Sequence, residues 1–509
     1  MDKLILDGKS LKLSDFLKVY DRNIDIELSK GAITNINRGR KTIEEIIESD
    51  KVVYGVNTGF GKFSEVRIPH EKIDELQKNL VMSHATGIGN PLSEAIVKAI
   101  YILKINSLAK GLSGIRLEVV DKLIHMYRAG IYPVVPEKGS VGASGDLAPL
   151  AHLNLVLLGL GEAFYKDKRM SGAEAMSHAG IEPIELKAKE GLALLNGLQV
   201  STAMAARAYK LLHICSRSAD VIGSLTLEGL KGTPRAFDPR IQVARGMPGQ
   251  ITVGRILTEL IQDSEIRRSH ADCGKVQDAY SLRCMPQVHG AVRDGLDFVK
   301  SILEIEINSC TDNPVVFPDE GEVISGGNFH GQPISMISDL LAISATYLSN
   351  ISERRIEYML DPNTSEMAGF LTEEGGLNSG FMIAQVTAAS LASENKVLAH
   401  PASVDSIPTS ANKEDFVSMS NHASRKAMEV ARNTATILGI ELLCACQAID
   451  LKSPLKTSEP LEAVHATVRT HIPHLASDRV MYKEIEWVTD FVLNGELMDI
   501  VRPWLGNES

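Results

Sequence analysis

The apolar positions of this chain follow a helical period over most of its length after residue 197. A shorter example lies earlier, at 115–129, where Val119, Leu123 and other apolar residues share one face and Gly130 ends the pattern. The later patterns are longer than most helices of globular proteins. They predict helices over residues 198–230, 250–265, 286–306, 332–360, 382–398, 417–448 and 479–495.

The first 197 residues have a different pattern, with short segments separated by many glycines and prolines. The stretches "LILDG" and "VVYGV" predict short strands, and "TIEEIIESD" (42–50) predicts a helix with Thr42 near its start. The sequence therefore predicts a mainly α protein, with a mixed N-terminal domain (1–197) and a long central helix bundle (198–509). Small residues on the long helices favour close packing, with further helices supplied by other subunits.

Composition and charge narrow the class of protein. The 509 residues carry a formal net charge of −11 and no block of Lys and Arg, which predicts no nucleic-acid partner. The N-terminus lacks the apolar core of a signal peptide, and no apolar run reaches the ~18 residues of a membrane span. We therefore expect a cytoplasmic protein with no membrane partner.

The cysteines and histidines indicate neither disulfides nor a metal site. Six scattered cysteines are too few for a disulfide framework and indicate a reducing compartment. Cys444 and Cys446 fall within an apolar helical pattern, which favours core packing over metal binding. No His or Cys spacing typical of zinc is present, so no metal is expected. The six cysteines are Cys215, Cys273, Cys284, Cys310, Cys444 and Cys446.

The glycine-rich stretch "GSVGASGDLAPLAHL" (139–153) is the strongest candidate for chemistry. Its glycine spacing matches neither a dinucleotide fingerprint nor a phosphate-binding loop, and Asp146 stands where a nucleophile elbow needs glycine. Besides a phosphate-binding loop, the stretch could be a plain turn or the nucleophile loop of a serine hydrolase built on Ser144. A fourth interpretation is backbone cyclisation, in which the nitrogen of Gly145 attacks the carbonyl carbon of Ala143. Loss of water from the ring and then from Ser144 leaves an electrophilic methylidene, which ordinary side chains do not supply.

The whole stretch resembles the signature of the aromatic amino-acid ammonia-lyases and aminomutases. Similar blocks extend along nearly the whole chain; they include "VVYGVNTGFGKFSEVRI" (52–68), "LVMSHATGIG" (80–89), "GLALLNGLQ" (191–199), "VQDAYSLRCMPQVHGA" (276–291), "TDNPVVF" (311–317), "VISGGNFHGQP" (323–333) and "HPASVDSIPTSANKEDFVSM" (400–419). The resemblance implies a 4-methylidene-imidazol-5-one (MIO) group formed from Ala143, Ser144 and Gly145. It also implies a homotetramer with shared active sites. It is strongest to the histidine-specific branch, which implies conversion of L-histidine to trans-urocanate and ammonia, with either the amine or the ring adding to the methylidene.

The resemblance also assigns roles to residues that match the family's motifs. Arg283 offers a planar cation to the substrate carboxylate. Tyr54 and Tyr280 are candidates for the base that removes the β-proton, and Tyr54 is the favoured one, provided that its neighbours lower its pKa. Asn196 is expected to hold the MIO oxygen or the substrate amine. The expected polar contacts are Gln277 and Asn313, and Phe329 is expected to form a wall of the site.

Substrate choice is predicted to depend on a few positions. Histidine-specific members of the family carry a Ser-His pair where this chain has Ser83-His84. Glu414 is the second marker: its carboxylate can accept a hydrogen bond from the substrate ring N–H, and we expect it to be a catalytic residue. Two residues depart from the family pattern: Leu198 replaces a threonine, and Phe416 replaces a histidine. We expect both to affect the substrate pocket. A tyrosine or phenylalanine lyase or aminomutase therefore remains the alternative, and a non-catalytic helical assembly protein is a rival from another class.

Overall fold

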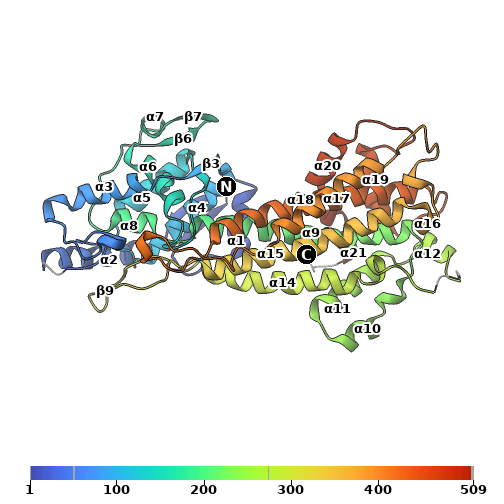
Figure 1. The fold of residues 1–509 in the computed structure, drawn as a ribbon, viewed down its shortest axis with the longest axis horizontal. Helices are drawn as coiled ribbons and strands as arrows, with labels where there is room; N and C mark the ends of the chain where they lie inside the picture. The colour runs from blue at the N-terminus through green and yellow to red at the C-terminus, as the bar shows by residue number, and fades with distance from the viewer. Residues whose placement is uncertain (1, 50–51, 273, 275, 506–509) are drawn as a thin grey trace. The chain divides into compact units, whose positions relative to one another are not determined.

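The computed structural model describes residues 2–49, 52–272, 274 and 276–505 (Figure 1). Contacts divide the chain into two compact units, and the sequence boundary at residue 197 remains a prediction. Unit 1 comprises Met1–Arg207, Lys300–Asp339 and Pro401–Arg425, and unit 2 comprises Ala208–Val299, Leu340–His400 and Lys426–Ser509. Unit 1 thus includes residues 198–207, 300–339 and 401–425, which the sequence placed in the C-terminal domain.

Unit 1 combines helices with short two- and three-stranded sheets. Parallel β1 and β2 form one sheet. The antiparallel sheets have the strand orders β3–β5, β4–β6–β7 and β8–β9. The strands are β1 (Lys3–Leu6), β2 (Asp25–Leu28), β3 (Ile88–Pro91), β4 (Ile131–Pro133), β5 (Pro136–Lys138), β6 (Glu162–Tyr165), β7 (Lys168–Ser171), β8 (Val315–Phe317) and β9 (Glu322–Ile324). The helices within it are α1 (Leu13–Phe16), α2 (Lys30–Glu48), α3 (Ile73–His84), α4 (Glu94–Ala109), α5 (Leu117–Ala129), α6 (Leu147–Leu155), α7 (Gly172–His178) and α8 (Glu190–Leu195).

Two predictions in this unit are corrected. The stretch "VVYGV" forms a turn instead of the predicted strand, whereas residues 4–6 of "LILDG" do belong to the strand β1, as predicted. Helix α2 begins at Lys30, twelve residues before Thr42, because Ser29 caps it by accepting a hydrogen bond from the Ala32 amide at 3.0 Å. Helix α5 matches its prediction and ends at Gly130, whose φ is 73°.

Unit 2 is almost entirely helical, and the predicted mainly α fold is confirmed. The helices within it are α10 (Pro239–Arg245), α11 (Pro248–Leu260), α12 (Glu265–Ser269), α13 (Tyr280–Arg283), α16 (Pro362–Ser365), α17 (Met382–Leu398), α19 (Glu459–His471), α20 (Tyr482–Leu493) and α21 (Glu496–Leu505). Four longer helices contain residues of both units: α9 (Gln199–Gly229), α14 (Met285–Glu306), α15 (Gln332–Leu360) and α18 (Ser420–Asp450).

A buried ion pair joins three of the long helices within unit 2. Glu441 of α18 accepts hydrogen bonds from Thr226 of α9 at 2.7 Å and from Ser352 of α15 at 2.6 Å. Arg355 of α15 donates to both oxygens of the same carboxylate, at 2.5 and 2.8 Å, and neither side chain of the pair is exposed. The carboxylate therefore fixes the packing of these helices by directional bonds as well as by apolar contact.

Helix α15 is long and apolar enough to cross a membrane, although no such segment was expected from the sequence. Among the described helices it alone meets both conditions, and 72% of its most apolar window is buried inside the protein. Such burial is typical of a core helix. The described cysteines Cys215, Cys284, Cys310, Cys444 and Cys446 are free, with Cys444 and Cys446 buried in the core, whereas Cys273 lies outside the described residues.

Candidate active site

The tripeptide Ala143-Ser144-Gly145 lies in the loop between β5 and α6, where two glycines have left-handed backbone conformations. Gly142 has a φ of 66° and Gly145 a φ of 82°. A Cβ atom at Gly145 would lie 2.2 Å from the carbonyl oxygen of Gly197, and one at Gly142 would lie 2.3 Å from Oγ of Ser418. The loop is therefore held between two other segments at a spacing that requires glycine.

Asp146 connects this loop to the start of helix α9. Its amide donates to the carbonyl of Gly197 at 2.8 Å. Its carboxylate accepts from the Ser201 amide at 2.7 Å and from the Ser201 hydroxyl at 2.6 Å. Burial raises the pKa of Asp146 to about 6, although the bonds from Ser201 favour the ionised form.

A cavity of about 720 Å³ in unit 1 contains seven of the residues that the sequence singled out. They come from segments that are far apart in the chain and include the hydroxyl-bearing Ser144. The cavity also has apolar walls, from Leu192 and Leu195 among others. The seven are Tyr54, His84, Ser144, Asn196, Asn313, Phe329 and Glu414.

Glu414 lies directly opposite the tripeptide. The hydroxyl of Ser144 donates to Oε1 of Glu414 at 2.9 Å. The other carboxylate oxygen accepts from Thr409 at 2.6 Å and from Ser410 at 2.9 Å, within a turn closed by a bridge between Thr409 and Glu414. The carboxylate thus has a fixed direction, as a group that orients a polar ligand needs.

His84 is the last residue of α3 and faces the same cavity. Its Nδ1 lies 2.8 Å from the Leu80 carbonyl, which assigns the proton to Nδ1 and leaves Nε2 as an acceptor. Burial lowers the pKa of His84, and the charge of Glu414 opposes this shift. Ser83 is exposed and bonds to the Leu80 carbonyl at 3.1 Å, outside the cavity wall.

Tyr54 is half-buried in the turn that replaces the predicted strand. Burial raises the pKa of its phenol, the Glu414 charge adds to this, and a hydrogen bond from the Gly61 backbone opposes it. Action as a base requires the opposite shift. Within unit 1 the groups around Tyr54 therefore do not supply the activation that this role needs.

Asn196 and Asn313 belong to one buried network. The side-chain amide of Asn196 donates to the Asn313 carbonyl at 2.7 Å and lies 3.3 Å from Oδ1 of Asp312. Asp312 in turn pairs with Lys189 at 2.9 Å, and both are buried. Asn313 Oδ1 accepts from the Gly326 amide at 2.7 Å. The network fixes both amides and therefore their direction at the cavity wall.

Besides Ser83, three residues predicted to act on the substrate do not line this cavity. Gln277, Tyr280 and Arg283 belong to unit 2, and Gln277 and Tyr280 are exposed. The guanidinium carbon of Arg283 lies 4.3 Å from the centre of the Tyr280 ring. Arg283 and Tyr280 therefore belong to a different unit from Ser144.

The two departures from the family pattern also lie outside the cavity wall. Leu198 is buried and lines another cavity, together with His330. Phe416 is 60% exposed and stacks on the His330 ring, with 5.9 Å between the ring centres. Phe416 thus contacts His330, and Leu198 lines a cavity to which that histidine also contributes. The effect of both positions on substrate choice remains a prediction.

Structure adds residues that the sequence did not single out. Thr409, Ser410 and Asp312 all lie within stretches that had been noted, but nothing in their spacing indicated which partners they would take. Lys104 and Lys189 are both buried, and no motif in the sequence indicated that either lysine would lie near the site.

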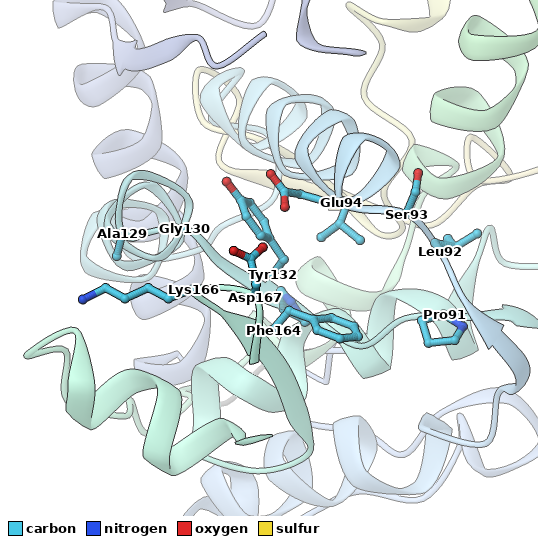
Figure 2. Close-up of a pocket in the computed structure, with 12 residues that line it drawn as sticks. Pro91, Leu92, Ser93, Glu94, Ala129, Gly130, Tyr132, Phe164, Lys166 and Asp167 are labelled. Carbon is cyan, nitrogen blue, oxygen red and sulfur yellow. The ribbon is translucent and has the colours of Figure 1, made fainter. Parts of the chain in front are cut away.

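A second cavity of about 610 Å³ lies beside β3, β4 and the start of α4, with Glu94, Tyr132 and Phe164 in its wall (Figure 2). It contains none of the predicted site residues. In the described part of the chain, no three His, Cys, Asp or Glu side chains are grouped so as to hold a metal ion.

Comparisons with known proteins show the family and agree with the fold. Residues 11–470 match the family model described as aromatic amino acid lyase. The chain is 49% identical to a histidine ammonia-lyase of Alkaliphilus oremlandii over 503 residues, which cover 99% of each chain. A histidine ammonia-lyase structure from Trypanosoma cruzi is 43% identical with a TM-score of 0.92, covering 99% of this chain and 96% of that one. A tyrosine aminomutase structure from Streptomyces globisporus is 33% identical with a TM-score of 0.93, covering 98% and 99%.

Proposed function

We propose that the protein eliminates ammonia from L-histidine to give trans-urocanate. The premise is that the chain belongs to the aromatic amino acid lyase family and is a carbon–nitrogen lyase. The observation that carries the choice of histidine is the position of Glu414 and His84 around one cavity with Ser144. A carboxylate and an imidazole can both bond to an imidazole ring, and a site built for such bonds rejects rings that lack them. The names of the two histidine ammonia-lyases above support the same substrate.

The residues of the loop fit an MIO group formed from Ala143, Ser144 and Gly145. Gly145 packs against Gly197 with no room for a Cβ atom, and Ala143 is buried, so the backbone is held in a tight bend. The Ser144 hydroxyl faces the cavity, where the methylidene carbon would form from its Cβ. When formed, the group would supply the electrophile that labilises the carbon–nitrogen bond.

The chain's own residues then bind the substrate and move its proton. Glu414 accepts the ring N–H, and His84 Nε2 is available for a second ring contact. Asn196, fixed by Asp312 and the Asn313 carbonyl, holds the amine or the MIO oxygen. Phe329 forms the wall beside the MIO loop, and Tyr54 takes the β-proton.

The base role of Tyr54 needs a cation nearby, because burial raises its pKa. We propose that Arg283 of a second copy provides that cation and binds the substrate carboxylate, together with Gln277 and Tyr280. The exposure of Gln277 and Tyr280 in unit 2 supports their availability to another subunit. The protein is then a cytoplasmic homotetramer with shared sites and no nucleic-acid or membrane partner.

Product formation from L-histidine, L-tyrosine and L-phenylalanine, each followed by its absorbance, tests the substrate. Urocanate from histidine alone is the expected result, and cinnamate, coumarate or a β-amino acid would instead favour the lyase or aminomutase alternative. The mass of the peptide containing residues 143–145 tests the chemistry. It should be lower by two waters in the native chain, but not in Ser144→Ala, which should lose activity by orders of magnitude. Ser64→Ala, at another serine of the cavity wall, should keep the mass difference. An intact tripeptide in the native chain would refute the MIO and favour a non-catalytic assembly protein.

A further inference from the structure

The short helix α8 ends at the residues that press on the MIO loop. Glu190–Leu195 is followed by Asn196 and Gly197, and Gly197 forms a parallel bridge with Gly145. The Gly197 carbonyl also accepts from the Asp146 amide at 2.8 Å. A helix of six residues has too few internal bonds to hold this position by itself. The position of Gly197 therefore depends on what fixes α8 from outside.

The C-terminal end of α8 is fixed by a buried lysine. Lys104, from the interior of α4, donates to the Ala193 carbonyl at 2.9 Å and to the Asn196 carbonyl at 2.6 Å. The last carbonyls of a helix have no partner within the helix, and a cation there also complements the helix dipole. The Asn196 carbonyl belongs to the same peptide unit as the Gly197 nitrogen. Lys104 thus sets the orientation of the peptide that adjoins Gly145.

This placement is energetically expensive for a residue with a purely packing role. Lys104 is 2% exposed, and burial lowers its pKa to about 7, which Asp312 opposes and Lys189 reinforces. An apolar side chain of similar length would avoid this desolvation. The polar end of Lys104 is therefore better explained by its two acceptors than by the core around it.

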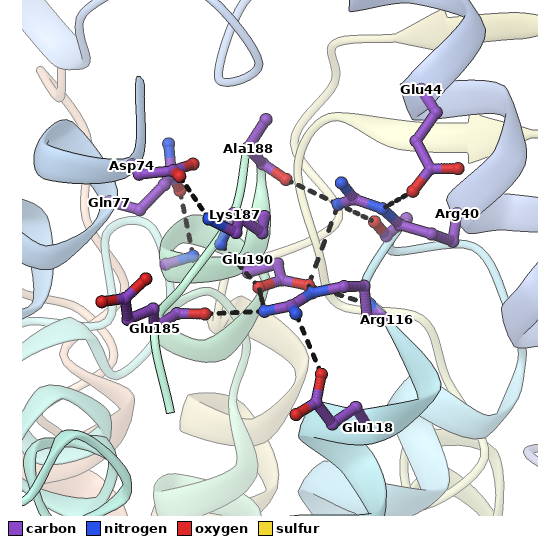
Figure 3. A network of polar contacts seen from close by, with 12 residues as sticks. Arg40, Glu44, Asp74, Gln77, Arg116, Glu118, Glu185, Lys187, Ala188 and Glu190 are labelled. Carbon is purple, nitrogen blue, oxygen red and sulfur yellow. Dashed lines mark hydrogen bonds and ion pairs between the residues drawn. The ribbon is translucent and has the colours of Figure 1, made fainter. Parts of the chain in front are cut away.

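The N-terminal end of α8 is fixed separately (Figure 3). Glu190 is fully buried and accepts from Arg116 Nε at 2.7 Å and Nη2 at 2.9 Å, and from the Lys187 amide at 2.7 Å. Gln77 accepts from the Gly191 amide at 3.0 Å. With this end anchored, a change at Lys104 acts on the Asn196–Gly197 end of the helix.

We propose that Lys104 is a positioning residue for formation of the electrophile, holding the Asn196–Gly197 peptide against Gly145 so that the tripeptide stays bent. The inference rests on the proposed MIO chemistry. In that step a bond forms between the Gly145 nitrogen and the Ala143 carbonyl carbon. The Ala143 oxygen leaves as water with the amide protons of Gly145 and Ser144, giving a carbon–nitrogen double bond. The Ser144 hydroxyl leaves as a second water with the proton of its own Cα.

The test follows the mass of the tripeptide in full-length protein purified at increasing times after a short pulse of synthesis. Lys104→Met keeps the length of the side chain but removes both bonds, and Lys104→Gln keeps an amide donor. The matched control is Lys98→Met, on the same helix and 9% exposed, whose ammonium interacts with Glu94 and lies over the Tyr132 ring. Circular dichroism and oligomer size report folding.

We expect folded Lys104→Met to lose the two waters at least about tenfold more slowly than Lys98→Met, equal to about 1.4 kcal/mol in the barrier. Lys104→Gln should lie between them. Equal rates in Lys104→Met and Lys98→Met would overturn the proposal, as would failure of both Lys104 variants to fold, since that would show a structural role. If the native chain itself keeps both waters, the proposed MIO chemistry fails, which this design distinguishes from failure at Lys104 alone.

Discussion

Replacement of Glu414 by glutamine is the sharpest test of the proposed ring contact, because it removes a charge and keeps the size. The carboxylate accepts three hydroxyl groups in the structure, from Ser144, Thr409 and Ser410, at 2.6–2.9 Å. A glutamine has only one side-chain oxygen, so it can accept only some of these three hydrogen bonds. A hydrogen bond to a charged group contributes about 1.5–3 kcal/mol, so loss of the ring contact should weaken imidazole ligands by roughly 10- to 150-fold.

The measurement compares two inhibitors that differ in their rings. trans-Urocanate carries an imidazole, and trans-cinnamate carries a phenyl ring that can neither donate nor accept. We expect Glu414→Gln to raise the inhibition constant of urocanate by the factor above while changing that of cinnamate little. Asp415→Asn makes the same chemical change at the adjacent, exposed carboxylate and should leave both constants unchanged.

Two outcomes would refute this reasoning. An equal loss for both inhibitors would mean that Glu414 shapes the cavity without recognising the ring, and no loss for urocanate would remove the contact altogether. The variant should also lower the pKa of both Tyr54 and His84, because the Glu414 charge raises each of them. A shift of the alkaline rise in kcat/KM toward lower pH would report the change at Tyr54.

Three further predictions concern the base, the buried lysine and the core. Tyr54→Phe should lower kcat by about 10²–10⁴-fold and abolish the rise in kcat/KM with pH, because a raised pKa makes the phenolate scarcer at neutral pH; an unchanged pH profile would exclude Tyr54 as base. The pKa of Lys104 is about 7 in the folded protein and 10.5 in its ordinary state. Between these pH values the unfolded chain therefore binds a proton at Lys104 that the folded chain has lost. The free energy of unfolding should therefore rise with pH there, by at most about 1.4 kcal/mol per pH unit relative to Lys104→Met, and denaturation at several pH values would detect a missing slope. Arg355→Met should destabilise the protein by about 3–5 kcal/mol in urea denaturation, and adding Glu441→Leu should restore most of it; a double variant as unstable as the single one would contradict the ion-pair argument.

Local chemistry made the proposed MIO loop a candidate from the sequence. Cyclisation requires three consecutive residues, so the small size of Ala143, the hydroxyl of Ser144 and the bare nitrogen of Gly145 are visible without a fold. The long helices were predictable for a similar reason, since a period of 3.6 residues is a property of neighbouring positions. Helix α4 was not predicted because nearly every position from Ile96 to Ala109 is buried, which removes the periodic contrast.

The tertiary structure decided what depends on distant segments. It places Glu414 beside Ser144 across 270 residues of chain, and it stacks Phe416 on His330, which lines another cavity together with Leu198. It also places Lys104 under the end of α8, where nothing in the pattern of α4 indicated a partner. The sequence by itself determined which residues can react, because that chemistry lies in adjacent atoms. Only packing decided which groups hold them in position, because those contacts join helices and loops that have no local relation in the chain.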